Sequence, residues 1–374
     1  MPEIEAKKLD REILSFIRNY SRKPAPDSAF DALAIKLFKF QFRKNSNYRK
    51  FCLVQKKTLK NVRCWREIPA LPAAGFKELV LTTFPAENAV RIFKTSGTTQ
   101  NDTGAHFFDT LKLYEAAIIP PFRQYLLPDI KTSPGFQPDT RSLLFCYLIH
   151  SPKEAPHSSL SCMAGIVDEA LAGKKGSYYV KSGVPDYERL AKDLGACSKK
   201  AFLLATSFLL KGFLDYLTRR RLSIKLSAGS RIMETGGLKG RTAEIPKSRL
   251  YHECEKVLGI RADHCVSEYG MTELSSQFYD TALWDKEMNI KRKPFKIGPA
   301  WTRTLVINPQ TGKRVKKGSV GILRHFDLAN RGSVLAIQTE DLGREAGEGF
   351  EILGRARGSQ LRGCSLNYEE FLNS

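Results

Sequence analysis

The sequence has no hydrophobic run long enough to cross a bilayer. Its longest nearly apolar stretches, residues 143–149 and 201–210, fall far short of the roughly 20 apolar residues that a spanning helix needs. The opening residues, MPEIEAKKLD, hold no apolar segment of the kind found in secretory signals. These absences predict a cytoplasmic protein without a membrane span. At 374 residues, the chain is long enough for more than one compact region.

Cysteine pairs at redox or metal-binding spacing are also absent. There is no C-x-x-C pair and no dense cysteine framework, which predicts free thiols in a reduced protein. The His and Cys residues between positions 252 and 265 match no standard zinc pattern, so we expect no metal cluster there. The eight cysteines are Cys52, Cys64, Cys146, Cys162, Cys197, Cys254, Cys265 and Cys364.

Acidic residues are scarce relative to basic ones. The chain has 39 Asp and Glu against 60 Lys and Arg, a formal net charge of +21, and residues 32–66 contain no acidic residue. Such a bias favours anionic partners through long-range attraction. No RNP, KH or zinc-finger signature accompanies it, so nucleic acid is not the expected partner. A nucleotide, an acidic protein or a solvated basic face explains the charge as well, and a basic scaffold or nucleic-acid-binding protein stays as an alternative.

The order of apolar patterns indicates the architecture. Asp27 precedes apolar residues three or four apart, from Phe30 to Phe40, which predicts a helix. Further on, short β-like runs alternate with helical patterns, and this predicts an α/β fold. The predicted regions are 1–84, mainly helical and packed on the body; 85–295, the α/β core; 296–353, a β-rich subdomain; and 354–374, a tail carrying Cys364.

Two common catalytic signatures are missing. The stretch TSGTT at 95–99 is rich in glycine and small hydroxyl residues, but no Gly-Lys-Ser/Thr follows it, which disfavours a P-loop NTPase. No G-x-S-x-G elbow exists, so a serine hydrolase is not expected. The backbone N–H groups of TSGTT could cradle phosphate, although taken alone the stretch is more typical of a surface turn.

Three further segments carry residues suited to nucleotide chemistry. In ETGGLKG at 234–240, paired glycines would let a flat ring stack on the backbone or would mark a tight turn. In SEYGMTE at 267–273, a carboxylate beside a threonine suits Mg²⁺ and phosphate, while a helix N-cap is the alternative for Thr272. In QTEDLG at 338–343, Asp341 could accept ribose hydroxyl protons, and a plain hairpin is the alternative.

Taken in order, the four segments resemble the motifs of the adenylate-forming enzymes, which include acyl-CoA synthetases, luciferase-type enzymes and peptide-synthetase adenylation domains. The resemblance implies ATP and Mg²⁺ as cofactors, with Glu273 holding the metal. It also implies the large-domain fold of these enzymes, with stacked α/β subdomains, a small β-rich unit and a truncated C-terminal domain. The implied nucleotide-binding residues are Thr95, Ser96, Gly97, Thr98, Thr99, Gly236, Gly237, Tyr269, Gly270, Met271, Thr272, Asp341 and Arg355.

A finer resemblance is to acyl-protein synthetases of the LuxE type. It rests on IPALP at 68–72, ETGGLKG at 234–240 and LRGCSL at 361–366. The family activates fatty acids for an acyl reductase, so the resemblance implies ATP-dependent formation of an acyl-adenylate from a carboxylic acid, with a fatty acid expected. The acyl group would then pass to a cysteine of the enzyme and on to a reductase or another acceptor. A phenylacetate-CoA-ligase-like enzyme, acylating CoA or a carrier protein, is the nearest alternative.

Within this resemblance, Cys364 is the implied acyl acceptor. From composition alone, a small buried residue would be the more typical role. Lys239 is a candidate for the catalytic lysine of the superfamily's C-terminal domain, although it could be a surface residue. His106 and His264 are weaker catalytic candidates, because single histidines are more often structural. One departure from the superfamily pattern is Gln100, which stands where many members carry glycine.

Overall fold

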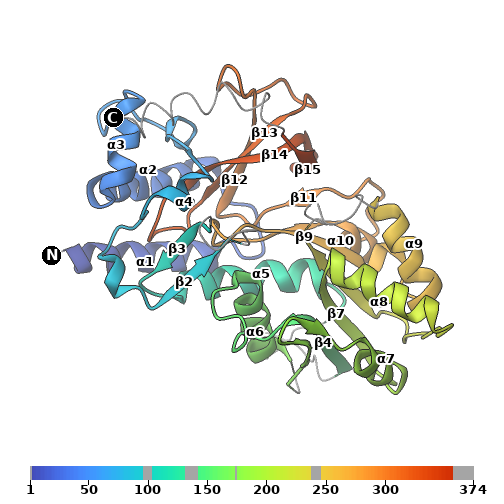
Figure 1. Ribbon diagram of the computed structural model, residues 1–374. Coiled ribbons are helices and arrows are strands. Elements are labelled where there is room, and N and C mark those ends of the chain that lie inside the picture. Colours follow the sequence, from blue (N-terminus) through green and yellow to red (C-terminus); the bar gives the residue numbers. More distant parts are fainter. Residues whose placement is uncertain (1, 96–102, 131–141, 173–174, 237–245, 357–374) are drawn as a thin grey trace. The chain divides into compact units, whose positions relative to one another are not determined.

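The computed structural model describes residues 2–95, 103–130, 142–172, 175–236 and 246–356 (Figure 1). The chain forms two compact units. Unit 1 takes the described residues of Met1–Pro120, Met271–Gln277 and Phe295–Ser374, and unit 2 takes those of Pro121–Gly270 and Phe278–Pro294. The four regions drawn from the sequence stay a prediction. Within the described ranges, no helix is both long and apolar enough to cross a bilayer.

Unit 2 is built on a parallel sheet. Its strands run in the order β5-β4-β7-β8-β9, with β6 antiparallel to β5 and β10 antiparallel to β9 at the two ends. The central strands β4 and β7 are nearly continuous apolar runs, which is typical of parallel strands covered on both faces. The bounds are β4 (Leu143–His150), β5 (Ser177–Lys181), β6 (Val184–Pro185), β7 (Lys200–Thr206), β8 (Arg231–Thr235), β9 (Cys265–Tyr269) and β10 (Phe278–Asp280).

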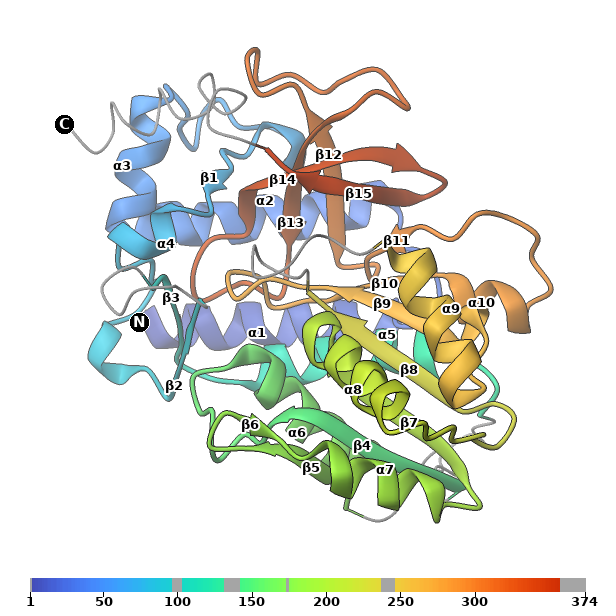
Figure 2. The same cartoon turned by 45° about the vertical axis from the view of Figure 1, so that its right-hand side comes forward.

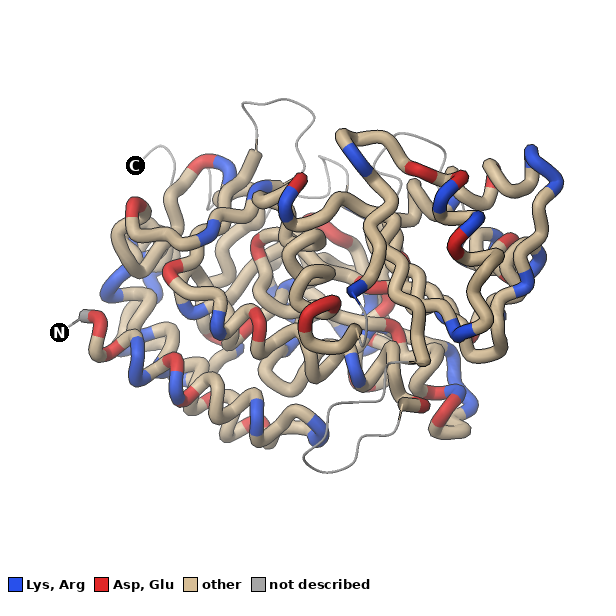
Figure 3. Tube along the Cα trace, turned by 90° about the horizontal axis from the view of Figure 1, so that it is seen from below, with Lys and Arg blue, Asp and Glu red and all other residues tan. Residues whose placement is uncertain are grey.

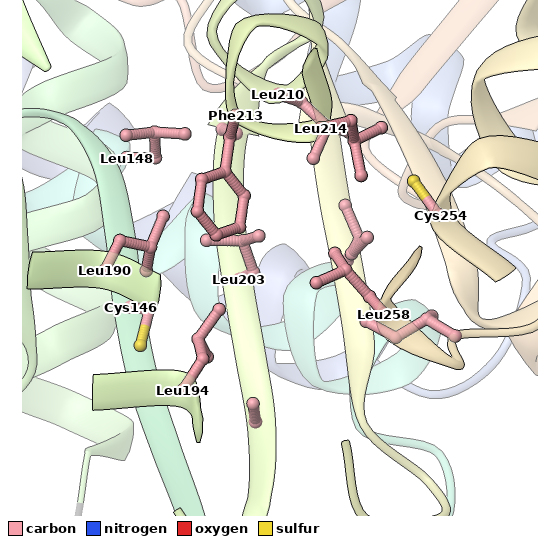
Figure 4. Packing of buried hydrophobic residues seen from close by; sticks show 14 of the residues in the cluster. Cys146, Leu148, Leu190, Leu194, Leu203, Leu210, Phe213, Leu214, Cys254 and Leu258 are labelled. Atoms are coloured by element: carbon pink, nitrogen blue, oxygen red, sulfur yellow. The ribbon is translucent and has the colours of Figure 1, made fainter. Parts of the chain in front are cut away.

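Helices cover both faces of this sheet. On one face lie α7 (Tyr187–Gly195), α8 (Ser207–Arg219) and α9 (Lys247–Leu258) (Figure 2). Their leucines and Phe213 meet alternate side chains of the strands in a buried cluster (Figure 4). On the other face, Phe122 of α5 packs against Phe202, with ring centroids 5.4 Å apart. The remaining helices of the α/β region are α5 (Lys112–Leu126), α6 (Ser159–Leu171), α10 (Ala282–Glu287) and the short 3₁₀ turn η4 (Ala262–His264).

Unit 1 combines helices with an antiparallel sheet. The sheet has the order β12-β13-β14-β15-β11, and β1 pairs with β14 in parallel, while β2 and β3 form a separate hairpin. The strands are β1 (Leu71–Pro72), β2 (Arg91–Lys94), β3 (Ala105–Phe108), β11 (Lys296–Ile297), β12 (Thr302–Ile307), β13 (Gly321–Asp327), β14 (Ala336–Ala346) and β15 (Gly349–Arg355). The helices are α1 (Pro2–Asn19), α2 (Asp27–Lys44), α3 (Ser46–Val54) and α4 (Gly75–Glu78), with the 3₁₀ turns η1 (Trp65–Glu67) and η2 (Ala86–Asn88).

The predicted helix after Pro26 is confirmed as α2. It begins at Asp27 and buries Phe30, Leu33, Leu37 and Phe40, as the spacing predicts. The ring of Phe30 meets Trp65 edge-on, with centroids 5.6 Å apart, and Trp65 in turn meets Phe326 of β13 at 4.9 Å. The helix therefore packs on the antiparallel sheet through aromatic contacts.

Acidic residues of α1 offset part of the basic segment 32–66. Basic and acidic positions are interspersed along α1, the helix that follows the N label in Figure 3. Lys36 of α2 pairs with Glu12 at 2.8 Å, and Arg43 pairs with Glu5. Because these pairs are exposed, each contributes only about 0–1 kcal/mol to stability. The basic residues of α2 that make them therefore lie on a solvated face.

Candidate active site

In unit 2, predicted site residues lie where the parallel strands end. Gly236 directly follows β8, Tyr269 is the last residue of β9, and Gly270 comes next. Ligands of open α/β sheets bind beyond the carboxyl ends of the strands, so this edge is the expected place for them. Gly236 has φ of +76°, a left-handed conformation that side chains rarely adopt. This conformation fits the tight-turn interpretation, which stays a prediction, as does a ring stacked on the backbone.

A buried carboxylate organises the same edge. Glu234, at the end of β8, is fully buried. Its Oε1 accepts hydrogen bonds from Lys247 Nζ at 2.7 Å and from the Tyr251 hydroxyl at 2.9 Å. Its Oε2 accepts from the Ser207 hydroxyl at the start of α8. Burial, with the charge of Glu234 as the next cause, raises the pKa of Tyr251 well above its usual value, so the phenol stays protonated and donates.

Two bonds tie the end of β9 into this arrangement. Lys247 also bonds the Ser267 hydroxyl, and the Thr235 hydroxyl donates to the carboxylate of Glu268. A side chain at Gly270 would collide with that Glu268 carboxylate. Because Glu268 is buried and held by Thr235, position 270 requires glycine for close approach.

The next residues of the motif, Met271 to Glu273, belong to unit 1. The carbonyl of Thr272 accepts a hydrogen bond from Nδ1 of His106 at 2.8 Å. Burial lowers the pKa of His106 to about 4, so its ring is neutral and carries the proton on Nδ1. The carbonyl of Glu273 accepts from Asn330 Nδ2 at 2.8 Å. No helix begins after Thr272 in this described segment, so the N-cap alternative is wrong.

Thr95 closes the base of the predicted phosphate loop. It follows β2, and its backbone N–H donates to the carbonyl of Gly104 at 2.9 Å. Its hydroxyl oxygen accepts from the Gly104 N–H at 2.8 Å. A Cβ at Gly104 would lie 3.2 Å from the backbone of Phe76, which is tighter than ordinary packing. The threonine therefore has a structural role at the paired ends of β2 and β3, and phosphate binding by its hydroxyl stays a prediction.

Asp341 and Arg355 are brought together on paired strands. They are register partners on β14 and β15, and Arg355 Nε lies 3.4 Å from Asp341 Oδ1. The guanidinium side chain is largely exposed, whereas that of Asp341 is mostly buried. Asp341 lies inside β14 at a register shift between Leu342 and Gly343. The motif thus lies in the first strand of the β14-β15 hairpin, as the hairpin alternative predicts, and ribose binding by Asp341 stays a prediction.

Several other predicted positions can be placed. His264 bonds the carboxylate of Asp263 at 2.7 Å, and together with the buried His106 it is held by structural contacts. Among the described residues, no group of three or more His, Cys, Asp or Glu side chains could hold a metal. The predicted metal at Glu273 stays a prediction, in which oxygens of a bound nucleotide share the ion, as is common for Mg²⁺. The predicted residues outside the described ranges are Ser96, Gly97, Thr98, Thr99, Gly237, Lys239 and Cys364.

Sequence reasoning missed most of the side chains that fix these segments. Ser207, Lys247 and Glu268 each meet a partner on another element. Ser207 directly follows β7 and Glu268 is near the end of β9, at the carboxyl edge of the parallel sheet, and the predicted α/β fold was the available signal. Asp327 is the last residue of β13, and Asn330 lies three residues after it. The sequence shows no motif at either position.

The sequence and the fold are similar to those of known acid-activating ligases. Residues 196–373 match the model of the family described as acyl-protein synthetase, LuxE. The long-chain-fatty-acid–luciferin-component ligase of Aliivibrio fischeri is 22% identical over 365 residues, covering 90% of this chain and 87% of that protein.

Solved structures of 2-hydroxyisobutyryl-CoA ligase share the fold. A postadenylation-state structure in complex with R3-HIB-AMP has a TM-score of 0.64 at 14% identity, covering 89% of this chain and 68% of that one. An open conformation in complex with 2-HIB-AMP and CoA has a TM-score of 0.62 at 13% identity, covering 89% and 71%. The matches agree with the resemblance predicted from the motifs: residues 196–373 are similar to the acyl-protein synthetases of the LuxE type, and the chain has the fold of the adenylate-forming ligases.

Proposed function

We propose that the protein couples a fatty acid to AMP and then transfers the acyl group to its own Cys364, from which a reductase or another acceptor takes it. The observation that carries the proposal is the LuxE family match, which spans residues 196–373 and so includes Glu273, Asp341 and Cys364. The motifs in that span stand in the order typical of adenylate-forming enzymes.

The first step forms the acyl-adenylate. A carboxylate oxygen of the acid attacks the α-phosphorus of ATP, the bond from that phosphorus to the bridging oxygen breaks, and pyrophosphate leaves. Such chemistry depends on positioning and on neutralising phosphate charge. Residues 95–99 would hold the leaving phosphates, Asp341 the ribose hydroxyls, and Gly236 with Gly237 the adenine. The left-handed conformation of Gly236, with no atom of the described residues within 4 Å of a Cβ placed there, supports room for a ring.

The residues present fit a magnesium ion carried with ATP. Glu273 supplies one carboxylate beside the hydroxyl residue Thr272, and Mg²⁺ prefers one or two carboxylates with phosphate and water oxygens. Bound there, the metal would neutralise charge on the departing phosphates. Lys239 is the proposed cation that would stabilise the negative charge developing in the same step.

The second step is transfer to sulfur. The Cys364 thiol releases its proton to solvent or a base, the thiolate attacks the acyl carbonyl, and the bond to the AMP oxygen breaks. The products are an enzyme thioester and AMP. Basic residues nearby in the sequence, such as Arg355 and Arg362, would lower the pKa of the thiol and raise the reactive fraction.

A long-chain fatty acid is the proposed substrate. The name of the Aliivibrio fischeri relative supports this class, because it is described as a long-chain-fatty-acid ligase. A carboxylate-dependent ATP/pyrophosphate exchange assay over acids of increasing chain length tests the first step. We expect exchange to rise with aliphatic chain length. Exchange only with aromatic acids would reject the fatty-acid assignment, and salt-sensitive nucleic-acid binding without any exchange would favour the basic scaffold.

Retention of labelled acyl group tests the second step. Wild-type protein incubated with ATP, Mg²⁺ and labelled fatty acid should retain label that hydroxylamine releases. The Cys364→Ala variant should lose that label while keeping exchange activity. Cys197→Ala is the matched control, because Cys197 is a partly exposed free cysteine. Equal retention by both variants would reject Cys364 as the acceptor, and rapid transfer to added CoA would favour the CoA-ligase alternative.

A further inference from the structure

The segment Met271–Gln277 has to be fixed mainly by side chains. It connects the end of β9 to β10 without forming a helix or a strand of its own. From Glu273 onward its residues are buried, so its backbone polar groups need partners inside the protein. One turn bond, from Leu274 N–H to the Met271 carbonyl at 3.2 Å, is internal to the segment.

Asn330 supplies partners at two points of the segment. Its Nδ2 donates to the Glu273 carbonyl at 2.8 Å and to the Val334 carbonyl at 2.9 Å. Its Oδ1 accepts from the Ser275 hydroxyl at 2.8 Å. The side chain is almost fully buried. Because two carbonyls and one hydroxyl surround it, only one orientation of the amide satisfies all three bonds.

Asp327 holds the following residues. Its carboxylate accepts from the backbone N–H of Ser275 at 3.0 Å and from the Ser276 hydroxyl at 2.9 Å. Trp301 Nε1 donates to the same Ser276 hydroxyl at 2.9 Å. Asp327 is fully buried at the end of β13, so these bonds attach the segment to the antiparallel sheet of the same unit.

His106 completes the attachment from the β2-β3 hairpin. Its Nδ1 donates to the Thr272 carbonyl, and its ring packs edge-on against Phe76 with centroids 5.6 Å apart. His106, Ser275 and Asn330 are among the residues that line a cavity of about 10 Å³. A space of this size holds at most a single water.

We propose that Asn330 is a positioning residue, which together with Asp327 and His106 holds the Thr272–Glu273 backbone in the geometry that binds the metal–nucleotide pair. We call these three residues the 273 clamp. The inference rests on the proposed role of Glu273. Each clamp bond to residues 272 and 273 engages a main-chain carbonyl, so the clamp fixes the backbone and leaves the choice of side chain at 273 open. A preorganised backbone spares the ligand site an ordering cost when the metal and nucleotide bind.

The test measures metal affinity in the presence of a nucleotide that cannot react. Mn²⁺ is titrated into full-length protein with α,β-methylene-ATP, and bound metal is followed by electron paramagnetic resonance. We expect Asn330→Ala to weaken Mn²⁺ binding by about tenfold, the equivalent of about 1.4 kcal/mol, which lies within the cost of leaving a buried polar group unsatisfied. Nucleotide affinity without metal should change less than twofold.

A matched control separates positioning from general loss of stability. Ser230 is also buried, in unit 2, and its hydroxyl accepts a hydrogen bond from the Ala201 N–H at 2.9 Å and donates one to the Ser227 carbonyl at 2.7 Å. Ser230→Ala should leave Mn²⁺ affinity unchanged. Hydrogen exchange of the peptide 271–277 should accelerate in Asn330→Ala and stay unchanged in Ser230→Ala. If Asn330→Ala does not fold, Ser276→Ala, which removes one hydroxyl bridging Asp327 and Trp301, carries the same two measurements.

The outcomes also distinguish this inference from the proposed function. Unchanged Mn²⁺ affinity in the clamp variants, equal weakening in Ser230→Ala, or no Mn²⁺–nucleotide binding by wild type would overturn the positioning role. Wild-type protein that binds Mn²⁺ with the analogue in a manner sensitive to Asn330→Ala, yet shows no acid-dependent exchange, would support the clamp and reject acid activation. If wild-type protein shows acid-dependent exchange and the clamp variants bind Mn²⁺ as tightly as wild type, acid activation is supported and the clamp is rejected.

Discussion

Protonation of His106 should destabilise the fold as the pH falls. Burial holds its pKa near 4, against an ordinary value of 6.5. The folded state therefore disfavours the charged ring, and the neutral ring donates from Nδ1 to the Thr272 carbonyl. Because the folded pKa lies below the unfolded one, the contribution to stability is complete above pH 6.5 and is lost as the pH drops from 6.5 to 4.

The size of the effect follows from the two pKa values. At about 1.36 kcal/mol per pKa unit, the full contribution is about 3.4 kcal/mol, and about 2.5 kcal/mol of it is lost by pH 4.5. His325, whose pKa burial lowers to about 3, adds a loss in the same direction. Asp327 acts oppositely, because burial raises its pKa to about 6 and its protonation below that value favours the folded state. A single-residue comparison is needed to isolate His106.

Urea unfolding at pH 7 and pH 4.5 provides that comparison. His106→Phe keeps a ring beside Phe76 and Phe108 but cannot be protonated. It should be less stable than wild type at pH 7, because the Thr272 carbonyl loses its donor. Its additional loss between pH 7 and pH 4.5 should be smaller than that of wild type by about 2.5 kcal/mol. His252→Phe, at an exposed position, is the control and should keep the wild-type pH dependence. An identical drop in wild type and His106→Phe would refute the reasoning.

Three further substitutions test packing, charge and backbone. Leu214→Ala, in the buried cluster of unit 2, should reduce the free energy of unfolding by about 2–5 kcal/mol, and a loss below 1 kcal/mol would contradict the packing. Arg331→Met should cost about 3–5 kcal/mol, because Asp10 and Asp109 lose a buried partner at 2.7 and 2.8 Å; adding Asp10→Asn should recover part of it. Gly236→Ala should cost about 1–2 kcal/mol from its positive φ alone, as measured by urea unfolding.

The parts of the fold that depend on local pattern could be predicted from the sequence. The spacing from Phe30 to Phe40 predicts α2 because a helix places residues three and four apart on one face. The apolar runs that became β4 and β7 predict strands of an α/β fold because they alternate with helical patterns. The order of short motifs then predicts the superfamily, since each motif needs only a few adjacent residues.

The bonds that fix the site could not be predicted, because they join residues far apart in the chain. His106 reaches Thr272 across 166 positions, and Asn330 reaches Glu273 across 57. Neither residue stands in a recognisable motif. Thr95 shows a related limit: composition predicts a phosphate ligand, whereas its hydroxyl oxygen also closes a hairpin onto Gly104. A single sequence gives the residue type at each position, but it does not show which distant residues that side chain contacts in the fold.

Two buried glutamates in the motif segments should respond differently to the same substitution. Glu234 has its carboxylate engaged by Lys247, Tyr251 and Ser207, so a metal there would have to displace an ammonium ion that already balances the charge. The clamp bond to Glu273 uses its main-chain carbonyl. Glu273→Gln keeps that carbonyl and removes the proposed metal ligand, so it should abolish Mn²⁺ binding with α,β-methylene-ATP. Glu234→Gln should instead lower stability by about 1–3 kcal/mol, because Lys247 loses its counter-charge, with Mn²⁺ affinity retained. If Glu234→Gln removes metal binding and Glu273→Gln does not, the metal ligand lies at the end of β8, and the clamp has a purely structural role.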